Sequence, residues 1–552
     1  MTAAQRSAGR KVSLRKDSRR PFDRILIANR GEIAVRIIRT CRDLGIETVA
    51  VFSDADADAL HVRTADTAVR LGPAPAAESY LRADAIIEAA LGTGAQAIHP
   101  GYGFLSERAG FARAVTDAGL VFVGPRSDAI EALGDKLTAR RTAQAAGVPV
   151  VPGTFDAIKV ERPDGVAAIV AAAEGIGFPL FVKASAGGGG RGMRRVATAT
   201  ELPAALSAGS AEAAAAFGDG AVYLEREVRP ARHIEVQLLG DADGTIVALG
   251  ERDCSIQRRH QKLVEESPAP GLTPDERIEL HDLAIRAARA ARLHNAATAE
   301  FLFDTDRRFW FLEVNARLQV EHGVTELITD LDLVAEQLWI AAGEPLSAPV
   351  LAAAVAARSP TRHAIEIRLA AEDPSRAFAP SPGRVGSWQM PSGPGVRVDT
   401  AIRAGERVPP DYDPMIAKIM TVGPDRTSAI ERMRRALDEV QVTGIQTTLP
   451  FDRALIRDVA FTTGEISTDW VDGHWDGEAR RLDVLPVAAG VAAGAVFDGR
   501  AAASGGGRSA PGDTRWGRVT LRDDRDPSLR KDAGGSAWRS AGRRAASDRW
   551  PR

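Results

Sequence analysis

Short apolar segments alternate with helical segments through the first 135 residues, and this alternation restricts the fold more than any other feature. Four apolar segments have the length of buried strands: Ile25–Ala28, Thr48–Phe52, Ala95–His99 and Leu120–Gly124. Between them apolar residues recur at helical spacing, as in Ile33–Ile38. Strands that alternate with helices predict a parallel, doubly wound sheet. We therefore expect an α/β domain over residues 22–135.

Composition excludes several classes of protein. The 552 residues suffice for several domains, and 45% hydrophobic with 26% charged residues is ordinary for a globular protein. The net charge of -2 gives no signal for nucleic acid, and no apolar run has the length of a membrane span. The two cysteines, Cys41 and Cys254, cannot form a disulfide framework. We expect a cytoplasmic protein that binds neither nucleic acid nor membrane.

Changes in composition predict the remaining organisation. A second α/β region is expected over residues 136–343, and a third region of alternating apolar and polar residues over 355–470. Residues 1–21 are basic and are expected to form a disordered tail, with an organelle transit peptide as the alternative. Gly, Ser, Arg and Asp dominate towards the end of the chain, so residues 471–552 are expected to be a linker or a disordered tail.

A glycine-rich loop follows a predicted strand at Lys183 and includes Gly187–Gly190 and Gly192. Backbone amides in a loop without side chains can approach phosphate oxygens closely, and a nearby ammonium adds positive charge. Met193–Val196 is typical of a strand that returns antiparallel to the first. We therefore expect a flap over phosphates instead of the strand-to-helix turn of a dinucleotide site. A purely flexible hinge is the alternative.

Residues 309–321 combine an apolar start with regular alternation. The polar positions are Glu313, Asn315, Arg317, Gln319 and Glu321, which in an extended backbone would share one face. Glu300 precedes them by one hairpin, so Glu300, Glu313 and Asn315 are expected to meet. Oxygen ligands of this kind suit Mg²⁺ or Mn²⁺ beside a phosphate. A half-exposed amphipathic strand is the alternative.

Lysine is rare in this arginine-rich chain, so the positions that keep it are informative. Lys136, Lys183 and Lys262 lie beside glycines or polar clusters. A compact ammonium at such places indicates a phosphate or anion contact. Lys262 ends the segment Glu251–Lys262, which contains nearly every type of polar side chain. We interpret that segment as functional, with a solvated run of charges as the alternative.

Together these segments resemble biotin carboxylase, the ATP-grasp component of biotin-dependent acyl-CoA and pyruvate-type carboxylases. The resemblance runs from Phe22 to Trp470 and also includes Ile27–Ala34, His99–Glu107 and Pro410–Ile416. It implies a Rossmann-like N-terminal domain, an ATP-grasp central domain and a mixed α+β C-terminal domain. The implied reaction is ATP- and bicarbonate-dependent carboxylation of biotin on a carrier protein, through carboxyphosphate and with Mg²⁺ or Mn²⁺.

The resemblance also implies roles for individual residues, by matched position. Glu321 would be the base that deprotonates bicarbonate, and Arg368 would stabilise the enolate-like oxygen of biotin. The bicarbonate pocket would comprise Lys262, Arg317, Gln319 and Val320, and the metal ligands would be Glu300, Glu313 and Asn315. The contacts to ATP would be Lys136, Lys183, Gly188, Gly189, Glu225, Val228, His233, Gln257 and His260.

The chain departs from the family pattern in two places. Gly323 stands where the family usually has proline, and we expect it to loosen the loop that carries Glu321. Arg226 replaces a lysine common in relatives. No methionine neighbours a lysine, so the sequence shows no recognisable site for biotin attachment. We expect a homodimer that works with a separate biotin carboxyl carrier protein and a carboxyltransferase subunit.

Two other functions stay open at this point. The chain could be another ATP-grasp ligase that joins a carboxylate to an amine, or a non-catalytic nucleotide-binding subunit of a carboxylase. The sequence does not identify the final acyl-CoA acceptor.

Overall fold

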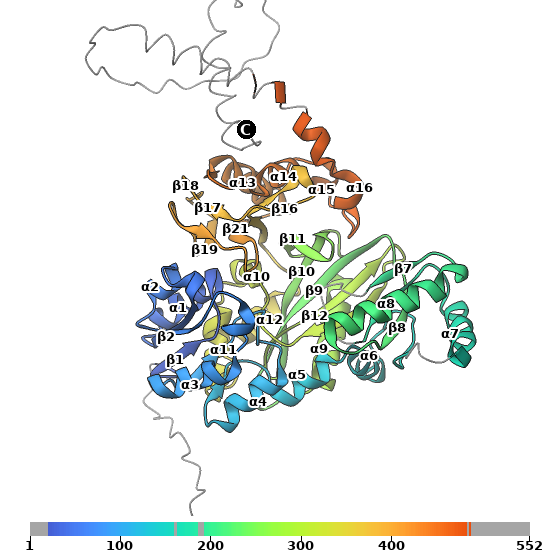
Figure 1. Ribbon diagram of the computed structural model, residues 1–552, viewed down its shortest axis with the longest axis horizontal. Helices are drawn as coiled ribbons and strands as arrows, with labels where there is room; N and C mark the ends of the chain where they lie inside the picture. Colours follow the sequence, from blue (N-terminus) through green and yellow to red (C-terminus); the bar gives the residue numbers. More distant parts are fainter. Residues whose placement is uncertain (1–19, 159–162, 186–192, 483–484, 487–488, 490–552) are drawn as a thin grey trace, which may run out of the picture.

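The computed structural model describes residues 20–158, 163–185, 193–482, 485–486 and 489. These residues form a mixed α/β structure around a large central sheet (Figure 1). The N-terminal region lies on one side of that sheet, a small sheet with two helices on the other, and the C-terminal helices above it. No helix in the described part of the chain is long and apolar enough to cross a membrane.

The N-terminal region contains a parallel sheet of five strands in the order β3-β2-β1-β4-β5. Its strands are β1 (Arg24–Ile27), β2 (Glu47–Ser53), β3 (Thr67–Gly72), β4 (Ala97–His99) and β5 (Val121–Phe122). Its helices are α1 (Gly31–Asp43), α2 (Leu60–Thr64), α3 (Ala83–Thr93), α4 (Ala109–Asp117) and α5 (Ser127–Gly134). The predicted doubly wound sheet is therefore confirmed. The sequence did not predict β3, a half-exposed edge strand with a weak apolar pattern.

The central sheet has eight strands in the order β13-β12-β9-β10-β11-β14-β21-β19, and every neighbouring pair is antiparallel. The second region supplies β9 (Ala231–Gly240), β10 (Ile246–Arg258), β11 (Gln261–Ser267), β12 (Asn295–Asp304) and β13 (Phe309–Asn315). The third supplies β14 (His363–Ala370), β19 (Val396–Thr400) and β21 (Met415–Gly423). Glu265 on β11 pairs with Glu366 on β14, so one continuous sheet joins the two regions.

A smaller sheet, in the order β7-β6-β8, lies beside the central one (Figure 1). It comprises β6 (Leu180–Ala184), β7 (Arg194–Val196) and β8 (Val222–Arg226), covered by α7 (Pro163–Ile176) and α8 (Leu202–Phe217). Val182 pairs with Arg194, so β6 and β7 are antiparallel, as the sequence predicted. Gly188 and Gly189, in the loop between these strands, lie outside the described residues.

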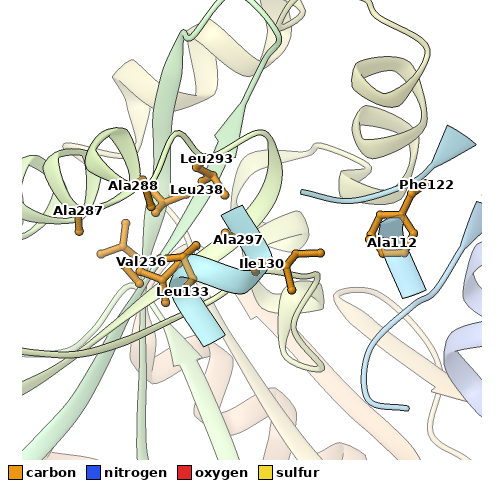
Figure 2. Packing of buried hydrophobic residues seen from close by; sticks show 14 of the residues in the cluster. Ala112, Phe122, Ile130, Leu133, Val236, Leu238, Ala287, Ala288, Leu293 and Ala297 are labelled. Atoms are coloured by element: carbon orange, nitrogen blue, oxygen red, sulfur yellow. The ribbon is translucent and has the colours of Figure 1, made fainter. Parts of the chain in front are cut away.

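Helices α6 (Lys136–Ala145) and α9 (Pro274–Ala290) lie next to the central sheet. Figure 2 shows Val236 and Leu238 of β9 beside Ala287 and Ala288 of α9 and near Leu133 of α5. These side chains belong to one buried apolar cluster that also reaches the N-terminal sheet. Burial of this apolar surface fixes β9 and β12, the strands that carry several polar side chains of the candidate site.

The remaining helices are α10 (His322–Thr329), α11 (Leu333–Ala341), α12 (Ala348–Ala356), α13 (Arg426–Glu439), α14 (Leu449–Leu455), α15 (Val459–Thr463) and α16 (Trp470–His474). Val471 is buried in the core of the C-terminal region, and Trp475 Nε1 donates a hydrogen bond to the Pro374 carbonyl at 2.9 Å. The expected boundary of a disordered tail at residue 471 is therefore wrong, because these apolar side chains hold residues 471–475 against the core.

Candidate active site

The three predicted metal ligands lie together on one hairpin. Glu300 on β12 pairs directly with Glu313 on β13, and Asn315 Nδ2 donates a hydrogen bond to Glu300 Oε1 at 2.7 Å. The register is irregular here, because Leu312 has no partner between Phe311 and Glu313. Phe311 is buried in the apolar core, whereas Glu313 is half-buried. Residues two positions apart in a regular strand share one face. The irregularity breaks this rule, so Phe311 can lie in the core while Glu313 lies in the candidate site.

The alternation expected through Glu321 is wrong beyond Asn315. Strand β13 ends at that residue, residues 316–320 form a loop, and Glu321 immediately precedes α10. The polar side chains meet all the same, because the loop folds back on the hairpin. Arg317 donates to Gln319 Oε1 at 2.7 Å, and Gln319 Nε2 donates to Glu300 Oε1 at 3.3 Å.

Lys262 lies at the centre of a group of buried carboxylates. Its Nζ is 2.7 Å from Glu321 Oε1 and 2.9 Å from Glu300 Oε1, and it also donates to Glu235. The polar segment that ends at Lys262 forms the β10–β11 hairpin, whose turn residues Arg259 and His260 have φ values of 49° and 63°. Such a two-residue turn matches the twist of the strands, and it places Lys262 at the start of β11.

Glu321 is fully buried and paired with a cation at each oxygen. Besides the Lys262 contact, an NH2 group of Arg368 lies 2.8 Å from Glu321 Oε2. Burial would raise the pKa of Glu321, but Lys262, Arg368 and Arg252 together hold it well below its ordinary value. The carboxylate is therefore ionised at neutral pH, as a proton acceptor must be.

Three buried charged residues that received no individual role from the sequence support this centre. Arg252 on β10 has no exposed surface and donates to Glu235, Gln237, Thr298 and Thr325. Glu265 on β11 accepts from Arg368 Nε at 2.6 Å, and burial raises the pKa of this carboxyl to about 7. A charged residue inside an apolar strand, as Glu235 is in Ile234–Leu238, was the available signal.

The predicted nucleotide contacts approach the centre from two sides. Lys136, at the start of α6, lies 3.0 Å from Glu313 Oε2, and this carboxylate raises the pKa of the Lys136 ammonium. Lys183 on β6 donates to the buried Glu225 on β8, which Arg140 also contacts. Val228 follows β8 and is half-buried.

Three other predicted nucleotide contacts lie on the central sheet. His233 Nε2 on β9 lies 3.1 Å from Glu300 Oε2, Gln257 is buried on β10, and His260 is exposed at the hairpin turn. Burial would lower the pKa of His233, but Glu300 raises it. His233, Glu235 and Glu300 also have ligand-type atoms within 4.8 Å of one another. The arrangement can bind a polyanion and a cation side by side.

Gly323 is a buried residue in the first turn of α10. A Cβ at this position would overlap the sulfur of Met420 on β21 and would lie 3.2 Å from Glu366 Oε2. Met420 thus fills the space that a proline ring would need. The packing offers no support for the expectation that Gly323 loosens the loop.

Three family models match the chain in succession. Residues 21–130 match the biotin carboxylase N-terminal domain, 135–349 the ATP-binding domain of the carbamoyl-phosphate synthase L chain, and 366–473 the biotin carboxylase C-terminal domain. Among curated relatives, biotin carboxylase of Nostoc sp. is 48% identical over 450 residues, which are 82% of this chain and 98% of that one. Biotin carboxylase 1 of Bacillus subtilis is 48% identical over 452 residues, 82% and 98% of the two chains.

Solved structures give the same result. The complex of Campylobacter jejuni biotin carboxylase with a β,γ-ATP ligand has a TM-score of 0.78 at 42% identity, over 82% of this chain and 99% of that one. The Hydrogenobacter thermophilus 2-oxoglutarate carboxylase biotin carboxylase domain dimer, with MgADP, ADP and bicarbonate, has a TM-score of 0.77 at 41% identity, over 82% and 98%. The expected fold class, with its ATP-grasp centre, is confirmed. The chain belongs to the biotin carboxylase family, ligases that use ATP, Mg²⁺ and bicarbonate to carboxylate biotin.

Proposed function

We propose that Glu321 is the base of this carboxylation. One observation carries the proposal: the carboxylate is fully buried, and Lys262 and Arg368 keep it ionised. The hydroxyl proton of bicarbonate moves to Glu321, and the freed oxygen attacks the γ-phosphorus of ATP. The bond from that phosphorus to the bridging oxygen breaks, which gives carboxyphosphate and ADP.

Bicarbonate is held by the loop between β13 and α10. The side chains that face it are Lys262, Arg317 and Gln319, together with the backbone amide of Val320. Arg317 and Gln319 are hydrogen-bonded to each other, so the guanidinium and the amide are positioned before the anion arrives. Fixed cations in a site with little water stabilise the charge that develops on carboxyphosphate.

The metal ligands are Glu300, Glu313 and Asn315. Two carboxylates and an amide oxygen on one hairpin are a hard oxygen set that fits Mg²⁺ or Mn²⁺. A bound ion would neutralise the charge on the phosphate oxygens. Lys262 keeps the Glu300 carboxylate in place, because its ammonium contacts Glu300 Oε1 at 2.9 Å.

ATP lies between the small sheet and the central sheet. Its phosphates contact Lys136, Lys183 and His233, and its adenine lies at Glu225 and Val228, with Gln257 and His260 nearby. The phosphate contacts of Gly188 and Gly189 stay a prediction from the sequence, because these residues lie outside the described ones. The pairing of Glu225 with both Lys183 and Arg140 fixes the strand end at which adenine binds.

Arg368 stabilises the oxygen of the biotin ureido ring after the ring loses its N–H proton. Its guanidinium bridges Glu265 and Glu321, so it lies next to the place where carboxyphosphate forms. Proximity of the two reactants supplies a large part of the rate in such a transfer.

The biotin is carried by a separate biotin carboxyl carrier protein, and a carboxyltransferase subunit receives the carboxyl group. The relatives include subunits of pyruvate and methylcrotonoyl-CoA carboxylases, so the acceptor depends on the partner and not on this chain. We also propose a homodimer in the cytoplasm, and the dimeric Hydrogenobacter domain supports the dimer. The proposed domains are residues 22–135, residues 136–343 and a third that begins at residue 355 and includes residues 471–475.

The test is ADP release with and without bicarbonate and free biotin, for wild type and Glu321→Gln. We expect bicarbonate to stimulate turnover in wild type and free biotin to raise it further, with neither effect in Glu321→Gln. Equal stimulation in both proteins would contradict the assignment of the base.

A further inference from the structure

Strand β21 carries a buried lysine that the reaction scheme does not use. Lys418 has no exposed surface, and its Nζ donates a hydrogen bond to the Val320 carbonyl at 2.7 Å. Val320 immediately precedes Glu321 in sequence. A buried ammonium is costly unless it is paired, so its presence at this contact requires an explanation.

The segment that Lys418 contacts lacks the hydrogen-bond ladder of a strand, and single hydrogen bonds hold its backbone. Besides the Lys418 contact, His322 Nδ1 lies 2.8 Å from the Gln319 carbonyl and Arg317 donates to the Leu318 carbonyl at 3.3 Å. Residues 316–320 lie outside helices and strands, and within this turn His322 N donates to the Gln319 carbonyl at a long 3.3 Å. The Val320 carbonyl belongs to the same peptide plane as the Glu321 amide. A hydrogen bond that holds the carbonyl therefore sets the direction in which the Glu321 side chain leaves the backbone. The same hydrogen bond also fixes Val320 itself, whose backbone amide faces bicarbonate in the proposed site.

A second side chain of β21 packs against the same turn. Met420 lies two residues after Lys418, and alternate residues of a strand share one face. The sulfur of Met420 occupies the space beside Gly323, two residues after Glu321. Strand β21 thus holds the turn at two points, by a hydrogen bond just before Glu321 and by packing two residues after it.

Carboxylates around Lys418 explain how its charge is tolerated. Glu32 Oε1 on α1 is 3.6 Å from Lys418 Nζ, and Asp399 Oδ2 on β19 is 3.9 Å away. These distances are longer than the 2.7 Å hydrogen bond to Val320, so the ammonium lies closer to the turn than to either carboxylate. Arg397 donates to Asp399 at 2.7 Å, so Lys418 shares the negative charge of this carboxylate with Arg397.

We propose that Lys418 is a positioning residue for the reaction, acting through the Val320 carbonyl to hold Glu321 in place, with Met420 completing the support. The proposal rests on the proposed role of Glu321 as the base. It makes the C-terminal region part of the catalytic geometry, because β21 and the base-bearing turn belong to regions far apart in the sequence.

The first test is Lys418→Met, which keeps the length of the side chain and removes the donor. We expect kcat for bicarbonate-dependent ADP release to fall about 10- to 100-fold, the range for a displaced catalytic group. The KM for ATP should stay unchanged, because the nucleotide contacts lie on other strands. In the Glu321→Gln background the same substitution should have no further effect, since residues that act as one unit are not additive.

Asp399→Asn is the matched control. It alters the charge near Lys418 Nζ but leaves the hydrogen bond to Val320 in place, so kcat per folded molecule should stay close to that of wild type. Equal losses in Asp399→Asn and Lys418→Met would overturn the proposal in favour of a general effect of buried charge. A full further loss from Lys418→Met in the Glu321→Gln background would also overturn it.

Met420→Ala keeps the proposal falsifiable should Lys418→Met fail to fold. It leaves a cavity beside Gly323, so kcat should fall while the KM for ATP stays constant, and again only when Glu321 is present. If Met420→Ala kept the kcat of wild type, the packing of Met420 beside Gly323 would not help to hold Glu321 in place. Loss of bicarbonate dependence in Glu321→Gln is measured separately, so failure of the base assignment is distinguishable from failure of the positioning role.

Discussion

Lys262 Nζ lies 2.7 Å from Glu321 Oε1, in the buried interior of the site. Arg368 binds the other oxygen of the same carboxylate at 2.8 Å. Together with Arg252, the two cations hold the pKa of Glu321 well below its ordinary value, so this carboxylate is ionised near neutral pH. In the proposed site the same two cations face the anionic reactants.

Replacing Glu321 with Gln keeps the shape of the side chain and removes the proton acceptor. Bicarbonate-dependent turnover should fall by about 10²–10⁴-fold, the usual range for loss of a general base. The Kd for ATP, measured by equilibrium titration, should not change. Near-normal carboxylation by this variant would refute the assignment.

Lys183→Ala should weaken ATP binding, because it removes a positive charge from the phosphates. A charge-assisted hydrogen bond contributes roughly 1.5–3 kcal/mol, so the Kd should rise about 10- to 100-fold. Arg113→Ala is the control, because Arg113 forms an exposed surface pair with Glu131. An unchanged Kd in Lys183→Ala, measured by calorimetry, would exclude the phosphate contact.

Gly323→Pro should destabilise the protein when it is made alone. Proline is tolerated in the first turn of a helix, but here its ring meets the sulfur of Met420. Overpacking of this kind costs about 1–3 kcal/mol. Met420→Ala in the same chain should recover part of the loss in Tm. If Gly323→Pro alone raised the Tm, Met420 would not occupy the space as described.

Glu265→Gln should change how stability depends on pH. Burial raises the pKa of Glu265 to about 7 in the folded protein, above its ordinary 4.5. The folded state therefore keeps a proton that the unfolded state loses, and this contribution to stability disappears as pH rises from about 4.5 to about 7.

Urea unfolding of both proteins across that window is the measurement. Wild type should lose stability relative to Glu265→Gln as pH rises, by up to about 3 kcal/mol in total, the equivalent of the shift in pKa. A constant difference between the two proteins would show that Glu265 does not titrate there.

Most of the fold could be predicted from local patterns. The buried parallel strands of the N-terminal region and β6, before the glycine-rich loop, show clear apolar runs, whereas β7 has a single buried apolar residue and was predicted as the strand that returns after the loop. Strand β3 could not be predicted in this way, because an edge strand needs little apolar surface. The continuous central sheet also escaped prediction, since the pairing of β11 with β14 joins residues about a hundred positions apart, and no local pattern records it.

The sequence predicted the residues proposed to contact the metal or the substrates. It did not predict the buried residues that hold those side chains in place. Glu300, Glu313 and Asn315 meet as the hairpin pattern implied. Arg252, Glu265 and Lys418 received no individual role from the sequence, because their importance comes from burial and from partners distant in sequence. The rarity of lysine was a usable signal for Lys418, which stands out in an arginine-rich chain.

The most direct test of the central claim is the formation of carboxybiotin from labelled bicarbonate, with ADP release measured in the same reaction. Purified wild-type protein with ATP, Mg²⁺ and a biotinylated carrier should form carboxybiotin in step with ADP, and Glu321→Gln should form almost none. Free biotin in place of the carrier should give a slower reaction with the same requirement for bicarbonate. ATP turnover that ignores bicarbonate, with no label transferred to biotin by the wild-type protein, would contradict the account.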